Sequence, residues 1–343
     1  MSEADDPRTW IHGDESAKEM LSRVLAERPS LLLPPLHRLP LQVGNVAEIT
    51  GPSSSGKSQV LLQAAVQCIL PKEWKGIRFG GLERMVIYFD LDCRFDVLRL
   101  VQVLKHRIME VPGCTNNSNQ GLQEGFQEYH DKVASSCSFD DDLLMACLRR
   151  FLYVRCYNSS DLLLSYWLVI QTMHSRIQIE SQALGVGIHF LMIDSIGAFY
   201  WIDRSCQSLP SGNHNRKIMS FQNLVETIVQ EIRKFLEVQP VLVLVSKASI
   251  FGAGTSTTHA QRPLEDLKQW RTSSRETEKL FREYMPPAWQ AFVTHRIYLQ
   301  ASDKCVYNNK YGTSPIYTSE WVQPPLNIKD QFAIADDGIF PIM

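Results

Sequence analysis

The sequence lacks the cysteine spacings of a metal site. Its 343 residues include 8 cysteines, yet none of them form a C-x-x-C pair and no cysteine–histidine group has zinc-binding spacing. The sequence also lacks an apolar run long enough to cross a membrane, and its start, Met1–Asp6, is acidic where a secretory signal would be basic. We therefore expect reduced thiols, no membrane partner, and a location in the cytosol or nucleus.

The chain also has little net charge, no internal repeat and no low-complexity tract. Lys and Arg total 35 against 37 Asp and Glu, which gives a formal net charge of −2. No overall basic field therefore attracts nucleic acid, and any DNA contact would have to come from a local patch or from a partner. At 44% hydrophobic, the chain can bury the core of one large α/β domain with appendages, or of two domains.

The clearest motif that is present covers residues 51–58. It reads Gly51-Pro52-Ser53-Ser54-Ser55-Gly56-Lys57-Ser58 and fits the pattern G-x-x-x-x-G-K-[S/T] without a mismatch. Glycines let such a loop wrap an anion with its N–H groups, and the N-terminus of the next helix adds positive potential. Lys57 would then reach the β- and γ-phosphates, and Ser58 would place its hydroxyl on Mg²⁺. The motif predicts ATP and Mg²⁺ as ligands.

The residues around the motif give it the expected context. Val46–Thr50 reads as a strand, apolar residues from Val60 to Ile69 recur at helical spacing, and Pro71 stops the run. The alternative is an ordinary Ser/Gly turn between a strand and a helix. Such a turn has no need of Gly-Lys-Ser at the start of the helix, so the phosphate-binding loop is favoured.

The rest of the chain alternates buried strands with helices. Strands are predicted at residues 85–90, 151–156, 187–193 and 241–245, and helices at residues 96–109, 140–150, 161–179 and 217–238. Strands without polar alternation between helices are typical of a parallel sheet covered on both faces. Short antiparallel strands are predicted at residues 292–300, 305–307, 316–322 and 332–335. The predicted fold class is α/β, a phosphate-loop NTPase core with a mainly parallel sheet and antiparallel C-terminal strands.

Two regions differ in composition from this core, which we place at residues 41–343. Residues 1–40 are predicted to form a tail, a short helix that starts at a capping box at Ser16, and the apolar, proline-bearing linker Leu31–Leu36. That linker either packs on its own domain or docks on a neighbouring protein. Residues 113–136 are rich in Asn, Gln, Gly and Ser, which predicts a polar insertion.

Two aspartates at predicted strand ends are candidates to complete the site. Asp194 ends an apolar strand, where a phosphate-loop fold needs a carboxylate for the Mg²⁺ water shell. Asp92 follows another strand at the same edge of the sheet and is the candidate to orient an attacking water. The alternatives are that Asp194 merely ends its strand at a loop, and that Asp92 is a strand-end cap or a solvated residue.

Several further stretches are distinctive. They are Cys68–Pro71, Phe95–Val101, Ala198–Arg204, Ala288–Gln290 ahead of His295-Arg296, and Phe332–Gly338. With the phosphate loop, the strand end Tyr88–Asp92 and the strand ending in Asp194, they resemble the core of the RecA-like recombinases over about residues 41–340, and more closely the eukaryotic recombinase paralogues.

The resemblance implies an ATP-binding subunit, and the two departures from the active recombinases described below indicate weak or no hydrolysis of its own. Such subunits form hetero-oligomeric complexes with sister paralogues, act in the nucleus in homologous recombination repair of double-strand breaks, and support the main strand-exchange recombinase. Single-stranded or branched DNA would be reached through the complex, and the segment Ser16–Leu39 would carry the partner contacts. The alternative is an enzyme, a DNA-stimulated ATPase that acts directly on single-stranded DNA. A kinase or transferase on the same core is disfavoured, because the sequence offers no lid with clustered arginines.

The chain departs from the active recombinases at two places. They carry a catalytic glutamate where this chain has Asp92, and an Asn-Gln pair, which couples the nucleotide to a DNA-facing loop, where it has Ser246-Lys247. Aspartate is one methylene shorter than glutamate, and the placing of an attacking water is sensitive at the ångström scale. Both departures indicate weak hydrolysis and no autonomous strand exchange.

By the same resemblance, the loops after residues 197 and 248 would face DNA. Basic side chains that could touch phosphates near the second loop are Lys247, Arg262, Lys268, Arg271 and Arg275. Acidic side chains are interspersed, so a merely solvated loop is the alternative. The aromatic run Phe199-Tyr200-Trp201 could stack on bases or pack on a neighbouring helix.

Overall fold

The structure is a computed structural model that describes residues 31–111, 141–163, 188–206, 220–239, 241–251, 269–270, 281–308, 312–335 and 337–342. The predicted helix at Ser16 and the predicted polar insertion at 113–136 lie outside these residues, as does most of the predicted helix at 161–179. No helix in the described ranges has the length and apolar character that would let it cross a bilayer.

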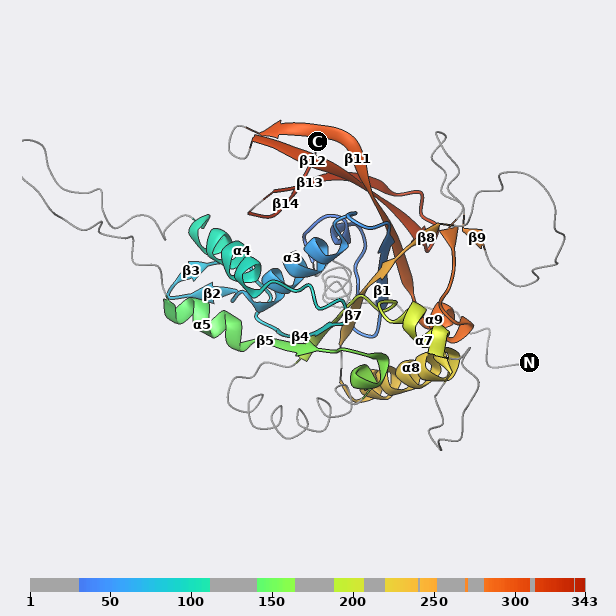
Figure 1. The fold of residues 1–343 in the computed structure, drawn as a ribbon. Coiled ribbons are helices and arrows are strands. Elements are labelled where there is room, and N and C mark those ends of the chain that lie inside the picture. The colour runs from blue at the N-terminus through green and yellow to red at the C-terminus, as the bar shows by residue number, and fades with distance from the viewer. Residues whose placement is uncertain are drawn as a thin grey trace, which may run out of the picture.

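A 9-stranded sheet forms the centre of the molecule, in the order β14-β13-β12-β11-β1-β7-β6-β4-β5 (Figure 1). Its strands are β1 (Val46–Gly51), β4 (Met85–Asp90), β5 (Phe151–Arg155), β6 (Ile188–Asp194), β7 (Leu242–Ala248), β11 (His295–Asn308), β12 (Gly312–Gln323), β13 (Lys329–Ile334) and β14 (Ile339–Pro341). Neighbours from β11 to β5 pair in parallel, and those from β11 to β14 pair antiparallel. The predicted fold class is confirmed.

Helices cover both faces of the sheet, as uniformly buried strands require. One core contains apolar side chains of α3 (Lys57–Ile69), α4 (Val97–Met109) and α5 (Asp141–Arg149). The other contains those of α8 (Phe221–Val238) and α9 (Pro287–Phe292), next to the short α7 (Tyr200–Cys206). Figure 1 shows α7, α8 and α9 gathered on one side of the sheet, away from α4 and α5. Because β1, β7, β6, β4 and β5 are parallel, the loops that follow them lie together at the carboxyl edge of the sheet.

The C-terminal strands differ in length from the prediction. Residues 292–300 and 305–307 were expected to form separate strands, but a single strand, β11, runs from His295 to Asn308, and Phe292 belongs to α9. The register with β12 shifts between Ala301 and Cys305, so the polar residues between them are taken up as an irregularity and do not end the strand. β11 is also parallel to β1, so it joins the two halves of the sheet. The sequence pattern missed β14 and the small hairpin of β2 (Glu73–Trp74) and β3 (Ile77–Arg78).

The described part of the apolar linker packs on its own domain. Leu31, Leu33 and Leu36 are 1%, 3% and 0% exposed and belong to the core that α3 helps to form, whereas Leu32 is 72% exposed. Leucines buried to this degree stabilise the fold by about 1.5–3 kcal/mol each. Of the two alternatives for this linker, the structure favours packing on its own domain for these three leucines.

Candidate functional site

The predicted phosphate-binding loop connects β1 to α3. Gly56 is the N-cap residue of α3 and has a left-handed backbone with a φ of 83°. A Cβ on Gly51 would lie 2.2 Å from the Leu299 carbonyl oxygen and 2.7 Å from the Ser55 hydroxyl oxygen, so no other residue fits there without a shift. A Cβ on Gly56 would lie 2.6 Å from the Ile334 Cδ1 atom. Both glycines of the motif are thus required by the close approach of β11 and β13 to the loop.

Gly56→Ala should destabilise the protein more than Gly44→Ala. The two glycines have φ values of 83° and 86°, but nothing lies within 4 Å of the position of a Cβ at Gly44. Gly44→Ala therefore measures the backbone conformation alone, about 1–2 kcal/mol, and Gly56→Ala adds the contact with Ile334. The free energies of unfolding from urea denaturation give both values. Equal losses of unfolding free energy in the two variants would show that Ile334 makes no steric contact with a Cβ at position 56.

Lys57 is bonded to its own loop. Its Nζ donates to the carbonyl oxygens of Gly51 and Pro52 at 3.0 and 2.6 Å and to the hydroxyl of Ser55 at 3.2 Å. Burial lowers the pKa of Lys57 to about 8, although the nearby carboxylates Asp194 and Asp92 oppose the shift. The ammonium group is therefore under-solvated, and this makes an anion a favourable partner for it.

The low pKa of Lys57 gives it an unusual chemical reactivity. Amine reagents attack the neutral form, and a group with a pKa of about 8 is half neutral at that pH, whereas an unperturbed lysine needs about pH 10.4. Competitive acetylation read by mass spectrometry should give Lys57 a midpoint near pH 8. Because a bound phosphate favours the ammonium form, an added nucleoside triphosphate should shift that midpoint upward. A midpoint above pH 10 without nucleotide would contradict the burial described here.

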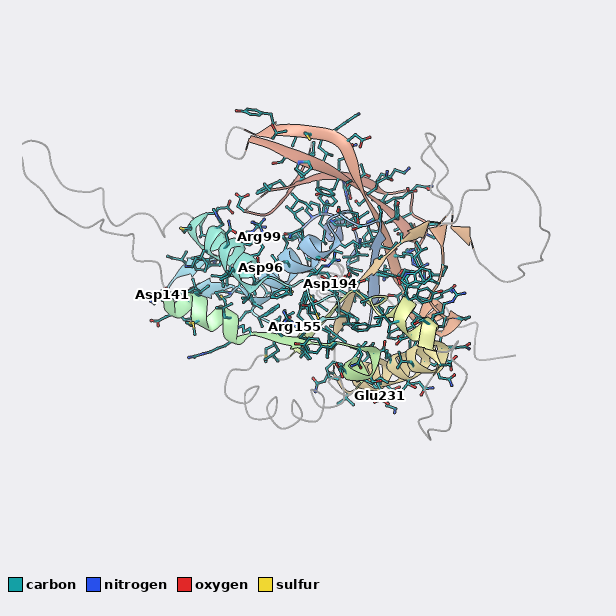
Figure 2. The ribbon with its side chains drawn as sticks, in the orientation of Figure 1. Asp96, Arg99, Asp141, Arg155, Asp194 and Glu231 are labelled. Carbon is teal, nitrogen blue, oxygen red and sulfur yellow. The ribbon has the colours of Figure 1, made fainter. Side chains whose placement is uncertain are left out.

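Asp194 lies at the end of β6 and is held by hydroxyl groups. Its Oδ2 accepts from the Tyr88 hydroxyl on β4 at 2.8 Å, and its Oδ1 accepts from the Ser246 hydroxyl on β7. The side chain is buried, and Figure 2 places it at the middle of the molecule. Burial, followed by the charge of Asp194, raises the pKa of Tyr88 well above its ordinary value, so that hydroxyl stays a donor. The carboxylate is thereby fixed at the carboxyl edge of the sheet, facing the loop.

A cavity of about 520 Å³ joins these parts. That volume lies within the range of small-molecule sites, about 300–1,000 Å³. The cavity is lined by Ser53, Ser54, Ser55, Gly56, Lys57, Ser58, Gln59, Asp92, Arg94, Asp194, Ser195, Gly197, Ala198, Tyr200, Trp201, Ala248, Ile250, Tyr284 and Tyr317. Most predicted site residues are therefore brought together, while Gly51 and Pro52 lie behind Lys57 and bond to it. The donors fit a magnesium nucleotide: backbone N–H groups and Lys57 suit phosphates, and Ser58 and Asp194 suit the ion and its water shell.

Asp92 faces the cavity from the β4–α4 connection. Its backbone N–H donates to the carbonyl oxygen of Asp194 at 3.4 Å. Loss of hydration raises the pKa of Asp92, and the carboxylate of Asp194 adds to the rise. A carboxylate with a raised pKa is a better proton acceptor, so this position keeps some capacity for general-base chemistry.

Sequence reasoning missed several residues that line the cavity. The tyrosines Tyr284 and Tyr317 lie far from the loop in the sequence and come from no motif, so only the fold could place them there. Arg94 could have been found, because it follows Asp92 by two positions at the same edge of the sheet.

Lys247 does not reach toward DNA, contrary to the expectation for the second loop. It is 4% exposed and forms an ion cluster with Glu48, Glu283 and Arg296. Its Nζ lies 3.0 Å from Glu48 Oε1 and 2.8 Å from Glu283 Oε2, and Arg296 Nε lies 2.7 Å from Glu48 Oε1. The lysine compensates buried carboxylates, so it is not available for phosphate contact. The other basic residues expected in that loop lie outside the described ranges.

The aromatic run after β6 divides between packing and exposure. Tyr200 is 8% exposed and packs against Phe221 of α8 and against Tyr284, with ring centroids 5.2 and 4.7 Å apart. Phe199 packs against the core that α8 and α9 help to form, whereas Trp201 is 60% exposed and lines the cavity. Packing on a neighbouring helix is therefore confirmed for Tyr200, and Trp201 keeps a face open to solvent.

Comparison with known proteins sets this geometry in a family. No family model matches the chain. It is 46% identical over 337 residues to "DNA repair protein XRCC2 homolog" of Arabidopsis thaliana, covering 97% of this chain and 89% of that protein. It is 26% identical over 294 residues to "DNA repair protein XRCC2" of Mus musculus, covering 86% and 82%. A shorter match, 38% identical over 64 residues, links 19% of this chain to 17% of "DNA repair protein RAD51 homolog 2" of Mus musculus. This confirms the resemblance to the recombinase paralogues, and the chain belongs to the XRCC2 family.

Proposed function

We propose that this chain is an ATP-binding subunit of a recombinase-paralogue complex that supports homologous recombination repair of DNA double-strand breaks. The observation that carries the proposal is a phosphate-loop motif that lines one cavity together with Asp194. Beside it, Asp92 and Ser246-Lys247 differ from the residues that the active recombinases use to hydrolyse the nucleotide and to couple it to a DNA-facing loop. The names of its relatives, which are DNA repair proteins, support the repair role and a place in the nucleus. We propose Mg²⁺ as the accompanying ion and sister paralogues as the partners.

The bound nucleotide would serve mainly to order the subunit. Asp92 is shorter than the glutamate of active recombinases, and Lys247 is committed to buried carboxylates. Ser246 donates a hydrogen bond to Asp194. The next residue, Lys247, cannot move toward a DNA-facing loop without leaving the buried carboxylates Glu48 and Glu283 uncompensated. These contacts support binding with weak or no turnover, and indirect help to the main strand-exchange recombinase.

A DNA-stimulated ATPase is the second candidate, favoured by Asp92 on the cavity wall with a raised pKa. Steady-state hydrolysis by the wild type and by Lys57→Ala, with and without single-stranded DNA, separates the two candidates. The accessory subunit should hydrolyse ATP no faster than Lys57→Ala. A DNA-dependent rate that only the wild type shows would replace our proposal with the second candidate.

Partner contacts are proposed for the segment that precedes Leu31. Deleting residues 1–40 would remove buried leucines and unfold the domain, so a useful truncation stops at residue 30. We expect that truncation to reduce capture of sister paralogues in a pull-down read by mass spectrometry, with thermal unfolding as the control for folding. Unchanged capture would place the contacts elsewhere on the chain.

A further inference from the structure

The β4–α4 connection brings a second cation to the cavity. Among the described residues that line it, Lys57 and Arg94 carry positive charge. Lys57 is tied to its own loop, whereas no hydrogen bond links the Arg94 guanidinium to another described residue. The Arg94 side chain is exposed, so it can turn toward a ligand without breaking a hydrogen bond to another described residue.

The backbone that carries Arg94 is nevertheless fixed. The N–H groups of Arg94 and Phe95 donate to the buried carboxylate of Asp90 at 3.3 and 3.1 Å. The ring of Phe95 packs against Tyr88 and Phe151, with centroids 4.8 and 5.3 Å apart. The fold therefore fixes the backbone position from which Arg94 extends, and from this position its side chain lines the cavity.

The charges of the cavity show what Arg94 contributes. Lys57 and Arg94 balance Asp92 and Asp194, so the sum for these side chains is zero, and it would be −1 without Arg94. The guanidinium lies near enough to Asp92 to oppose the rise in the pKa of that carboxyl. Without Arg94 the net negative charge of these side chains would repel the triphosphate, and the guanidinium removes this repulsion.

We propose that Arg94 binds the terminal phosphate of the nucleotide and so selects a nucleoside triphosphate over a diphosphate. This inference rests on the proposed function, because it needs the loop to hold a nucleotide. A water-orienting carboxylate faces the γ-phosphate in phosphate-loop enzymes, so the position of Asp92 marks that end of the cavity. Arg94 follows two residues later on a fixed backbone and lies near enough to Asp92 to act on the pKa of that carboxyl, so we place it at the same end. Guanidinium pairs with phosphate through two parallel hydrogen bonds, and a diphosphate offers no partner at this place.

The test compares the affinities for MgATP and MgADP, by calorimetry on the full chain, for the wild type, Arg94→Ala, Arg94→Lys and Arg107→Ala. Arg107 lies on α4 outside the cavity lining, so its variant removes the same charge without touching the site. We expect Arg94→Ala to weaken MgATP about tenfold and MgADP less than about twofold. Arg94→Lys should recover part of the loss, and Arg107→Ala should match the wild type.

Equal losses for MgATP and MgADP, or no loss for either, would overturn the role of Arg94 and leave nucleotide binding itself intact. If the wild type bound neither nucleotide, the proposed function would fail together with this inference. The two failures are thus distinguished by the wild-type titration alone.

Discussion

Lys57→Ala should weaken MgATP binding about 100-fold. A hydrogen bond from a charged donor contributes about 1.5–3 kcal/mol, and two bonds to phosphate oxygens therefore give about 3 kcal/mol or more. Part of this gain is offset, because Lys57 must first leave the carbonyl oxygens of Gly51 and Pro52. The lost charge also matters in a cavity that holds Asp92 and Asp194. Titration with a fluorescent ATP analogue measures the change.

The control for Lys57→Ala is Lys304→Ala, which removes the same charge from an exposed position of β11. Burial of the ammonium opposes folding, as its lowered pKa indicates, so Lys57→Ala should not unfold the domain. Thermal unfolding without nucleotide checks this point. Similar affinities for the wild type and Lys57→Ala would mean that the loop does not hold the phosphates.

Lys247→Met should lower the free energy of unfolding by about 3–5 kcal/mol. Removing one partner of a buried ion cluster leaves an uncompensated charge, and the resulting cost has this size. Here Glu48 is 0% exposed and Glu283 is 6% exposed, and both lie within 3.0 Å of the Lys247 ammonium. Urea denaturation of the wild type and the variant measures the difference.

Two further variants separate charge compensation from simple loss of packing. Adding Glu283→Gln to Lys247→Met removes a surplus carboxylate but keeps an oxygen for the N–H groups of Tyr284 and Met285, so part of the stability should return. Lys234→Met, in an exposed pair with Glu231 on α8, should cost less than about 1 kcal/mol (Figure 2). Unaltered stability of Lys247→Met would contradict the buried cluster.

The ion cluster also has a pH dependence. Burial opposes ionisation of Glu48, but the charges of Lys247 and Arg296 outweigh it and hold the pKa of Glu48 below its unfolded value of 4.5. The unfolded chain therefore binds more protons than the folded one in this range. The stability that this carboxyl contributes is complete above about pH 4.5 and is lost as the pH falls through its lower folded pKa.

The parts of the site that follow a local pattern were predictable from the sequence. The motif at 51–58 could be recognised from the residue types and their spacing alone. The structure added the reason for its glycines, because a Cβ there would contact Leu299 or Ile334. The apolar strands ending at Asp90 and Asp194 indicated a parallel sheet, because strands that are buried on both faces show no polar alternation.

The parts that depend on long-range contacts were not predictable. The cluster of Lys247 with Glu48 and Glu283 joins residues that are 199 and 36 positions apart, and charged residues inside strands have no local signature of burial. The continuous strand β11 passes through polar residues that would end an isolated strand, because β12 supports it across the irregularity. The resemblance to the recombinases therefore assigned Lys247 to a DNA-facing loop, and the sequence pattern divided β11 in two.

The fate of bound nucleotide tests the central claim, that the binding half of the site is intact and the hydrolytic half is not. The full chain is loaded with ATP labelled on the α-phosphate and freed of unbound nucleotide, and the bound label is resolved into ATP and ADP over time, with Lys57→Ala alongside. We predict that the wild type retains label, that most of the label stays ATP with or without single-stranded DNA, and that Lys57→Ala retains none. Rapid conversion of the bound ATP to ADP, conversion that single-stranded DNA accelerates, or a wild type that retains no label would contradict the account.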